Sequence, residues 1–374
     1  MKTASTCAVL GVFALAAGSA IALPESAAAA TDTRVVGDPI RMADSADSIA
    51  AEFAEKLAEK DVQKDVKKQI ELSTQYMAKL KDYATANATA TDLDRVQLHT
   101  IKIAGAGGHF AEAKKAAATL KKDFVAKGKL DAKTVNAALL EVLRTSDDAA
   151  ALKDAVFESL SGNVKQDSDT LMTLAVEALA RGDKAVAKEV YEKLGTTNPQ
   201  YAQYASELVA ATTQTGTAFD HFDVKDIDGK TLKSKDYKGK VVLIDFWATW
   251  CGPCKAELPN VKKVYTEYKS DGFEVIGISL DKAGSEQALR DFLKKSEMDW
   301  PQFCDFQGWG NVLAKKYDVH GIPHAILLDA DGKIVTTAAR GEALGAAVQY
   351  LAQYKDKFDT KKKDKPKKEK PSKK

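Results

Sequence analysis

Val241-Val-Leu-Ile-Asp-Phe-Trp-Ala-Thr-Trp-Cys-Gly-Pro-Cys-Lys-Ala-Glu-Leu-Pro259 is the stretch that decides the fold of this chain. It opens with an apolar run rich in β-branched residues, which predicts a buried strand. From Lys255 to about Lys269 apolar residues recur at helical spacing, so we expect a helix there. Cys251 and Cys254 therefore lie between a strand and a helix.

A Cys-x-x-Cys motif at such a place has a physical purpose. Cys251 would lie at the first turn of the helix, where unpaired backbone N–H groups and the helix dipole stabilise a thiolate. Cys254, one turn further on, is placed to attack a mixed disulfide formed at Cys251. Pro253 is tolerated early in a helix because its missing N–H would have had no partner there. The spacing predicts a redox-active dithiol.

The sequence around the two cysteines resembles a known family. Trp250-Cys-Gly-Pro-Cys254 is similar to the active site of thioredoxins. The longer run from Gly239 to Pro259 is similar to the TlpA/ResA branch, the extracytoplasmic thiol–disulfide oxidoreductases. The resemblance covers about Thr217 to Leu351. It implies an α/β thioredoxin fold, a central mixed sheet flanked by helices, for residues 217–356.

The resemblance also implies roles for single residues. Cys251 would attack the disulfide of a partner, and Cys254 would resolve the intermediate. Pro323 corresponds to a cis-proline that faces the disulfide, and its backbone neighbours would pair with an extended substrate chain. The residues expected to contact the substrate are Trp250, Gly252, Pro253 and Ile322.

Two carboxylates near the motif are candidates for proton transfer. Asp245 interrupts an apolar strand, where an ionised carboxylate is costly unless it is paired or functional. Thioredoxins carry an aspartate at this place as the acid/base for the resolving cysteine, so the resemblance implies that role; a structural, hydrogen-bonded aspartate is the alternative. Glu257 lies one helical turn past Cys254. In ResA-like proteins a glutamate here influences the titration of the cysteines; a solvated glutamate on the helix face is the alternative.

His324, Cys304 and Ala248 decide whether the site could bind a metal, use a third thiol or act as a peroxidase. His324 beside two thiols could bind Cu(I), but we favour a surface histidine that tunes the cysteines, and we expect no metal and no organic cofactor. Cys304 is expected to be a buried small hydrophobe. Peroxiredoxins need threonine three residues before the reactive cysteine, and that position is Ala248, which argues against a peroxidase.

The N-terminus has the pattern of a secretory signal, which we place at residues 1–30. Lys2 gives a positive start, Val9 to Leu23 is apolar and uncharged, and small residues follow. A retained membrane anchor is the alternative, although the apolar segment is short for spanning a bilayer. We expect an exported protein of a bacterial periplasm or cell envelope, soluble once the signal is removed.

Residues 45–211 are rich in Ala, Lys, Glu and Leu, and their apolar residues recur at helical spacing. Asp169 to Pro199 matches the spacing of a tetratricopeptide helix pair, and Gly108–Ala113 resembles Gly182–Ala187. These patterns predict an all-α helical-repeat domain that binds a peptide or protein; a plain helical bundle is the alternative. Thr212–Thr217 is expected to be a polar linker.

Charge is unevenly distributed along the 374 residues, whose net charge is +2. Lys355–Lys374 contributes +7, which leaves −5 for the rest of the chain. Residues 357–374 are rich in lysine and cannot bury a core, so we expect a disordered tail. Because it has no aromatic residue beyond Phe358, we expect it to aid solubility rather than to bind a specific nucleic acid.

Together these patterns predict an exported thiol–disulfide oxidoreductase. By resemblance it would reduce disulfides of exported partner proteins, with apocytochrome c as a candidate, and be re-reduced by a membrane-bound electron donor. The alternatives are an oxidant or isomerase, a copper-handling module, and a non-catalytic envelope scaffold. Gly252-Pro253 alone does not fix the direction of electron flow.

Overall fold

The structure is a computed structural model that describes residues 45–355. The expected signal (1–30) and the lysine-rich tail (357–374) lie outside the described residues. The chain divides into two compact units, with the boundary between Ser146 and Asp147. Within residues 45–355, no helix combines the length and apolar character needed to cross a membrane.

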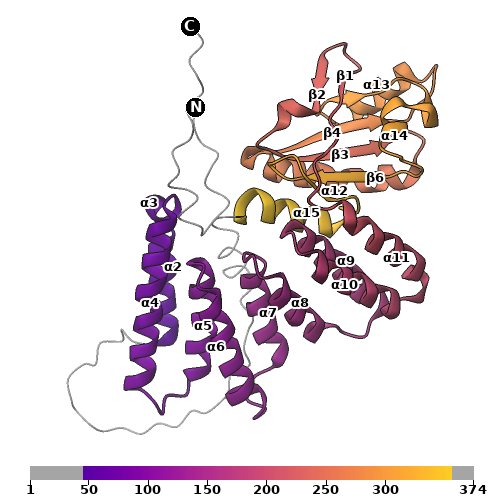
Figure 1. The fold of residues 1–374 in the computed structure, drawn as a ribbon. Coiled ribbons are helices and arrows are strands. Elements are labelled where there is room, and N and C mark those ends of the chain that lie inside the picture. The colour runs from indigo at the N-terminus through magenta and orange to yellow at the C-terminus, as the bar shows by residue number, and fades with distance from the viewer. Residues whose placement is uncertain (1–44, 356–374) are drawn as a thin grey trace. The chain divides into compact units, whose positions relative to one another are not determined.

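The described part of the first unit, residues 45–146, is helical. Ser45 caps the first helix, because its hydroxyl accepts a hydrogen bond from the Ser48 N–H at 3.1 Å. Phe53, Tyr76 and Leu80 are buried between helices. Figure 1 shows α4, α5 and α6 side by side. The elements are α2 (Ala46–Leu57), α3 (Lys60–Gln63), α4 (Val66–Ala86), α5 (Leu93–Ala106), α6 (Phe110–Leu120), the π-helical turn η1 (Lys121–Val125) and α7 (Ala132–Leu143).

The second unit begins with helices that precede its sheet. They are α8 (Ala149–Ser159), α9 (Val164–Ala180), α10 (Lys184–Thr197), the 3-10 turn η2 (Pro199–Tyr201) and α11 (Ala202–Ala211). Gly182 joins α9 to α10 with a φ of +80°, a conformation that favours glycine. The helix pair expected over Asp169–Pro199 is therefore present, and its assignment to the tetratricopeptide repeats stays a prediction.

The boundary between the units differs from the one predicted at Thr212–Thr217. That segment is not a free linker, because Thr212–Gln214 forms the 3-10 turn η3. The Thr215 hydroxyl donates to the Val335 carbonyl at 2.9 Å, and the Gly216 N–H donates to the Ile334 carbonyl at 2.7 Å. In addition, α9 packs against the last strand and the last helix of the unit. The buried Thr212 and Thr215 thus direct their hydroxyls to backbone carbonyls, while the other residues of the segment are exposed.

The sheet of the second unit confirms the predicted thioredoxin fold. Its five strands lie in the order β5-β4-β3-β6-β7; β3 is parallel to β4 and antiparallel to β6 (Figure 1). The strands are β3 (Val241–Trp247), β4 (Phe273–Ser279), β5 (Gln302–Phe303), β6 (His324–Leu328) and β7 (Ile334–Thr336). Because β3 is central and nearly all its residues are buried, it fixes the position of the cysteine motif beyond its carboxyl end.

A separate hairpin precedes the sheet, formed by β1 (Asp223–Lys225) and β2 (Thr231–Lys233). Strand pairing starts only at Asp223, although the apolar residues Phe219 and Phe222 precede it. Phe219 is instead buried and stacks on Tyr317, with ring centroids 4.9 Å apart. Aromatic packing, rather than strand pairing, accounts for this apolar residue.

Helices and short turns precede, connect and follow the strands of the sheet. They are α12 (Gly252–Tyr268), α13 (Glu286–Lys295), α14 (Val312–Lys316) and α15 (Glu342–Gln349), with the short 3-10 turns η4 (Ser234–Tyr237), η5 (Lys269–Asp271) and η6 (Gly308–Gly310). The last helix, α15, ends as an α-helix at Gln349 and continues as the π-helical turn η7 (Tyr350–Tyr354).

Candidate active site

The two cysteines lie where β3 passes into α12. Cys251 is the N-cap residue of α12 and is joined to Cys254 by a disulfide. The Cys254 N–H donates to the Cys251 Sγ at 3.1 Å. In the reduced protein, this N–H and the helix dipole would stabilise negative charge on the Cys251 sulfur. The pair is thus built for thiolate chemistry on Cys251.

A second segment, Ile322-Pro323, faces the disulfide. The peptide bond between these two residues is cis, and the Ile322 carbonyl oxygen lies 3.8 Å from the Cys251 Sγ. The segment is held there because β6 begins directly after it, with His324 opposite Phe246 of β3. The structure therefore brings the cysteine motif and Ile322-Pro323, which are far apart in the sequence, next to each other.

Asp245 lies within β3 and retains partial solvent access. The pKa of its carboxyl group is raised to about 7, chiefly by burial and next by the negative charge of Glu257, while the positive charge of Arg340 opposes them. A carboxyl group that is half protonated near neutral pH can both accept and return a proton. Asp245 therefore has the acidity that a proton acceptor for a thiol needs.

Glu257 is not a solvated glutamate on the helix face. Its Oε1 accepts hydrogen bonds from the Gly341 N–H at 2.8 Å and from the Asn260 Nδ2 at 2.7 Å. Asn260 also donates to the Gly341 carbonyl at 3.0 Å. These bonds hold the loop before α15 against α12, and that loop carries Arg340.

Arg340 could not be found from the sequence, because it lies far from the cysteines along the chain and in no motif. Its charge lowers the pKa of both Asp245 and His324. Its Nε is buried and has no hydrogen-bond partner among the described residues. A partly buried guanidinium beside a titrating carboxyl group is a means of adjusting the acidity of that group.

His324 is not the surface histidine that the sequence predicts. It belongs to β6, is partly buried, and lies with its ring centroid 5.8 Å from that of Phe246. Burial lowers the pKa of His324 to about 4, and the charge of Arg340 acts in the same direction. The imidazole is therefore neutral near pH 7. Within residues 45–355, no three His, Cys, Asp or Glu side chains gather as a metal site would require.

The sequence also did not reveal Gln302, which lies on β5 in the same row of the sheet as Asp245. Its amide lies over Gly277, where an added Cβ would collide with it. Gly277 is opposite Asp245 in the β3–β4 register and opposite Gln302 in the β4–β5 register. The Trp247 Nε1 donates to the Gln302 Oε1 at 3.0 Å, which fixes the amide. An uncharged amide thus occupies the row of the sheet that contains Asp245.

The rim of the site is aromatic. Trp250 is exposed, as are Gly252 and Pro253, so all three are accessible to a partner. Trp309, which the sequence did not single out, lies against Trp250 with ring centroids 6.2 Å apart. The surface around Cys251 therefore contains two tryptophans rather than one.

Cys304 lies outside this site and is buried, as predicted. Burial raises the pKa of its thiol. A thiol that stays protonated is a poor nucleophile. Cys304 thus behaves as a small apolar residue.

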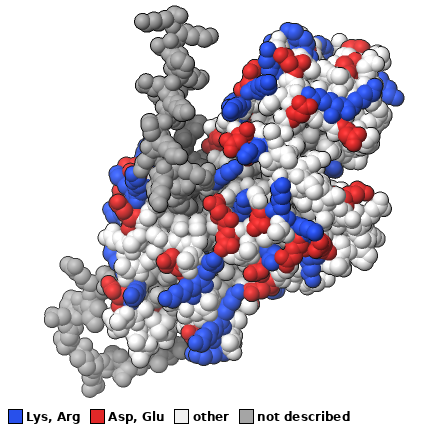
Figure 2. All heavy atoms as spheres, viewed as in Figure 1, with Lys and Arg blue, Asp and Glu red and all other residues white. Residues whose placement is uncertain are grey.

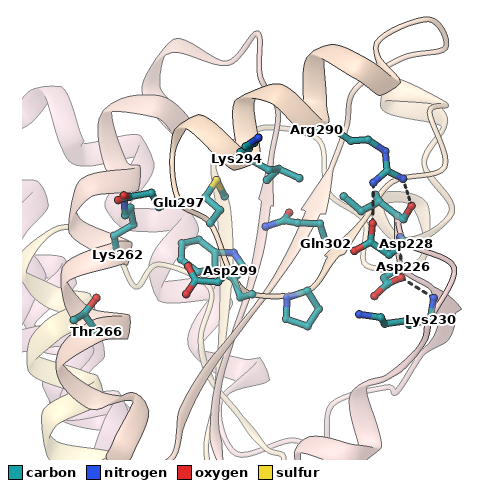
Figure 3. A pocket seen from close by; sticks show the side chains of 15 residues that line it. Asp226, Asp228, Lys230, Lys262, Thr266, Arg290, Lys294, Glu297, Asp299 and Gln302 are labelled. Atoms are coloured by element: carbon teal, nitrogen blue, oxygen red, sulfur yellow. Dashed lines mark hydrogen bonds and ion pairs between the residues drawn. The ribbon is translucent and has the colours of Figure 1, made fainter.

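A hollow of about 870 Å³ lies elsewhere on the second unit, between the β1–β2 turn, α13 and β5 (Figure 3). Opposite charges pair around it, with Arg290 2.8 Å from Asp228 and Lys262 3.0 Å from Glu297. Neither cysteine of the disulfide lines it. The hollow is therefore separate from the redox chemistry.

The charged surface in view is mixed. Figure 2 shows Lys and Arg side chains interspersed with Asp and Glu over this face. Such a surface favours no single sign of charge in a partner. The absence of a specific nucleic-acid partner stays a prediction.

Comparisons with known proteins point to one family. Residues 215–337 match the model of the AhpC/TSA family. The thiol-disulfide oxidoreductase ResA of Bacillus thuringiensis subsp. konkukian is 36% identical over 115 residues, which cover 31% of this chain and 64% of the relative. A ResA of Bacillus cereus is 37% identical over 122 residues, which cover 33% of this chain and 68% of the relative.

Solved structures named as thiol-disulfide oxidoreductases are similar as well. The thioredoxin domain of one from Bacteroides vulgatus is 30% identical, with a TM-score of 0.34, and the match covers 37% of this chain and 96% of that one. The chain spans somewhat less than two thirds of the length of the first ResA relative, at 64%. On the similarity to the ResA proteins, the chain belongs to the family of ResA thiol-disulfide oxidoreductases.

Proposed function

We propose that this protein is an exported thiol–disulfide oxidoreductase that reduces disulfides of envelope proteins through Cys251 and Cys254. The observation that supports this most is the position of Cys251. It caps α12, its Sγ accepts the Cys254 N–H at 3.1 Å, and the Ile322 carbonyl faces it at 3.8 Å. Catalytic roles for Asp245, Glu257 and Pro323 belong to the same proposal.

The reaction is a two-electron exchange in two steps. The Cys251 thiolate attacks one sulfur of the partner's disulfide, so that an S–S bond to Cys251 forms and the partner's S–S bond breaks. The partner's other sulfur leaves as a thiolate and takes up a proton. Cys254 then loses its proton and attacks the Cys251 Sγ, which forms the Cys251–Cys254 disulfide and releases the second partner thiol. The dithiol is oxidised by two electrons and the partner is reduced by two.

Asp245 would accept the proton of Cys254 in the second step. Its pKa of about 7 lets it receive that proton and pass it to the departing partner thiolate or to water. Glu257 acts by its charge on Asp245 and by holding the Gly341 loop, so it is a positioning residue. A membrane-bound electron donor would return the Cys251–Cys254 disulfide to the dithiol.

The helical region before the sheet would select the partner. Stacked helix pairs present extended surfaces that bind peptides. The pair α9 and α10 is the part that supports this role, because its spacing fits such a repeat.

The test is a stoichiometric exchange assay. The protein, reduced with dithiothreitol and freed of it, is mixed with insulin, and new insulin thiols are counted by alkylation. We expect about one insulin disulfide to be reduced per chain, and we expect Cys251→Ser to slow the reaction more than about a thousandfold, since a hydroxyl does not replace the thiolate. Cys304→Ala is the matched control and should react within about twofold of wild type. Exchange that survives Cys251→Ser would contradict the proposal and leave the scaffold alternative.

A further inference from the structure

An exposed apolar surface borders the disulfide. Large apolar side chains are exposed at five places in the described residues, and three of them, Trp250, Trp309 and Val312, lie near one another in the sequence or in space. Trp250 is 49% exposed and Trp309 is 44% exposed. Grouped exposed apolar residues mark interaction surfaces, whereas single ones do not.

One buried residue holds both tryptophans in place. The Asp281 carboxylate accepts the Thr249 N–H at 3.1 Å and the Thr249 Oγ1 at 2.6 Å, directly before Trp250. The carbonyl oxygen of the same residue accepts the Gly308 N–H at 3.2 Å, directly before Trp309. The two rings therefore meet because their chain segments are tied to one residue.

The loop that carries Trp309 is held in a costly conformation. Phe306 has a φ of +56°, which is unfavourable for a residue other than glycine by roughly 1 kcal/mol or more. Asn311 holds the loop in this conformation. Its side chain is fully buried, and its Nδ2 donates to the Asp305 Oδ1 at 3.0 Å and to the Ser279 carbonyl at 3.3 Å. A ring presented by a fixed loop loses little conformational entropy when a partner covers it.

The position of this surface points to its occupant. A polypeptide that brings a sulfur to Cys251 must pass Trp250, the adjacent residue, and Trp309 lies against it. Two exposed indole rings offer apolar area and no charge, so they favour an apolar or aromatic side chain. Building on the proposed function, we propose that Trp250 and Trp309 bind a large apolar side chain next to the target cysteine of an extended substrate polypeptide. Trp309 then determines substrate specificity.

The experiment compares three disulfides with the same reduced protein. Two are disulfide-linked dimers of a short peptide whose cysteine is flanked by Phe in one and by Ser in the other; the third is oxidised glutathione. We expect Trp309→Ala to lower kcat/KM for the Phe peptide about tenfold and to leave the other two within about twofold, because only the Phe peptide uses the indole. Trp309→Phe should keep most of the preference. Asp236→Ala, at an exposed residue of the same unit outside the helices that precede the sheet, is the control and should change none of the three rates.

Several outcomes would overturn this inference. An equal loss on all three disulfides would mean that Trp309 acts on the cysteines, and no loss on the Phe peptide would mean that it does not bind substrate. A wild-type dimer that Trp309→Ala dissociates, with unchanged exchange, would assign the surface to a second copy of the chain. If wild type reacts with none of the three disulfides, the proposed function itself fails, which is distinct from the loss of the Phe preference alone.

Discussion

Asp245 in β3 and Asp281 just past β4 both hold a carboxyl group inside the second unit, yet their surroundings are opposite. Asp281 is 1% exposed and its carboxylate accepts three hydrogen bonds, two from Thr249 and one from the Ser279 Oγ at 2.7 Å. For Asp245 no such bond to the carboxyl group is found among the described residues, and burial raises its pKa to about 7.

The difference separates a carboxylate whose oxygens accept hydrogen bonds from a carboxyl group whose pKa is raised to about 7. A buried carboxylate with donors on its oxygens stabilises the fold and fixes neighbouring segments. A carboxyl group that is buried without donors keeps its proton to higher pH and is available for proton transfer. The same residue type thus occurs in two opposite surroundings, one within β3 and one just past the end of β4.

Removing Asp281 should have the largest effect on stability. Asp281→Ala would leave the Thr249 and Ser279 donors buried without an acceptor, so we expect a loss of about 3 to 5 kcal/mol in the free energy of unfolding. Urea unfolding followed by tryptophan fluorescence measures it, because all four tryptophans lie in the second unit. Asp236→Ala, at an exposed aspartate of the same unit, is the control. A loss below about 1 kcal/mol would contradict a structural role for Asp281.

Replacing Asp245 should have the opposite effect on stability. The folded protein keeps the Asp245 proton up to about pH 7, whereas the unfolded chain releases it near 3.8, so wild-type stability falls as pH rises between these values. Asp245→Asn, which stays neutral, should be more stable than wild type by about 2 to 4 kcal/mol at pH 8 and about equal to it below pH 4. A gain that does not depend on pH would show that Asp245 does not titrate in this range.

The same variant should slow the second step of the exchange. Without an acceptor for the Cys254 proton, we expect resolution of a mixed disulfide at Cys251 to slow about 10- to 100-fold at pH 7. Release of a thiol from a preformed mixed disulfide measures this step alone. A rate equal to that of wild type would remove Asp245 from the mechanism.

Arg340 should shift the pH profile by a smaller amount. Arg340→Met removes the positive charge that opposes the raised pKa of Asp245, so the midpoint of the resolution rate should move upward by about one pH unit. Arg340→Lys keeps the charge and should restore most of the wild-type profile. A downward or absent shift in the Met variant would show that Arg340 acts elsewhere.

Glu257 should give a shift at least as large as that of Arg340, in the other direction. Glu257→Gln removes a negative charge near Asp245 while its amide oxygen can still accept the Gly341 N–H, so we expect the midpoint to fall by about one unit or more. The resolution rate as a function of pH measures it. An upward shift would mean that the loop, rather than the charge, controls Asp245.

The sequence predicted the features that lie within one continuous stretch, and the family resemblance added Ile322 and Pro323 from outside it. The strand, the cysteine pair and the helix follow one another, and Asp245 was found because a charge interrupts an apolar run. Arg340 and Trp309 could not be predicted, since each reaches the site through tertiary packing from a distant part of the chain.

The errors have a similar cause. His324 follows the proline in sequence and was expected at the surface, but strand pairing with β3 partly buries it. Thr212–Thr217 has the composition of a linker, yet three of its residues bond to β7. Amino-acid composition shows that a segment is polar, but it does not show whether its polar groups bond to water or to the backbone of another element.

The measurement that tests the central claim most directly is the reduction potential of the Cys251–Cys254 pair. The protein would be equilibrated in graded dithiol buffers, and its thiols counted by alkylation. A reductase requires a strongly reducing pair, so we predict a value near that of thioredoxin, about −270 mV. A value near about −120 mV, that of a strong disulfide-forming oxidant, would contradict reduction and assign the site to disulfide formation or isomerisation.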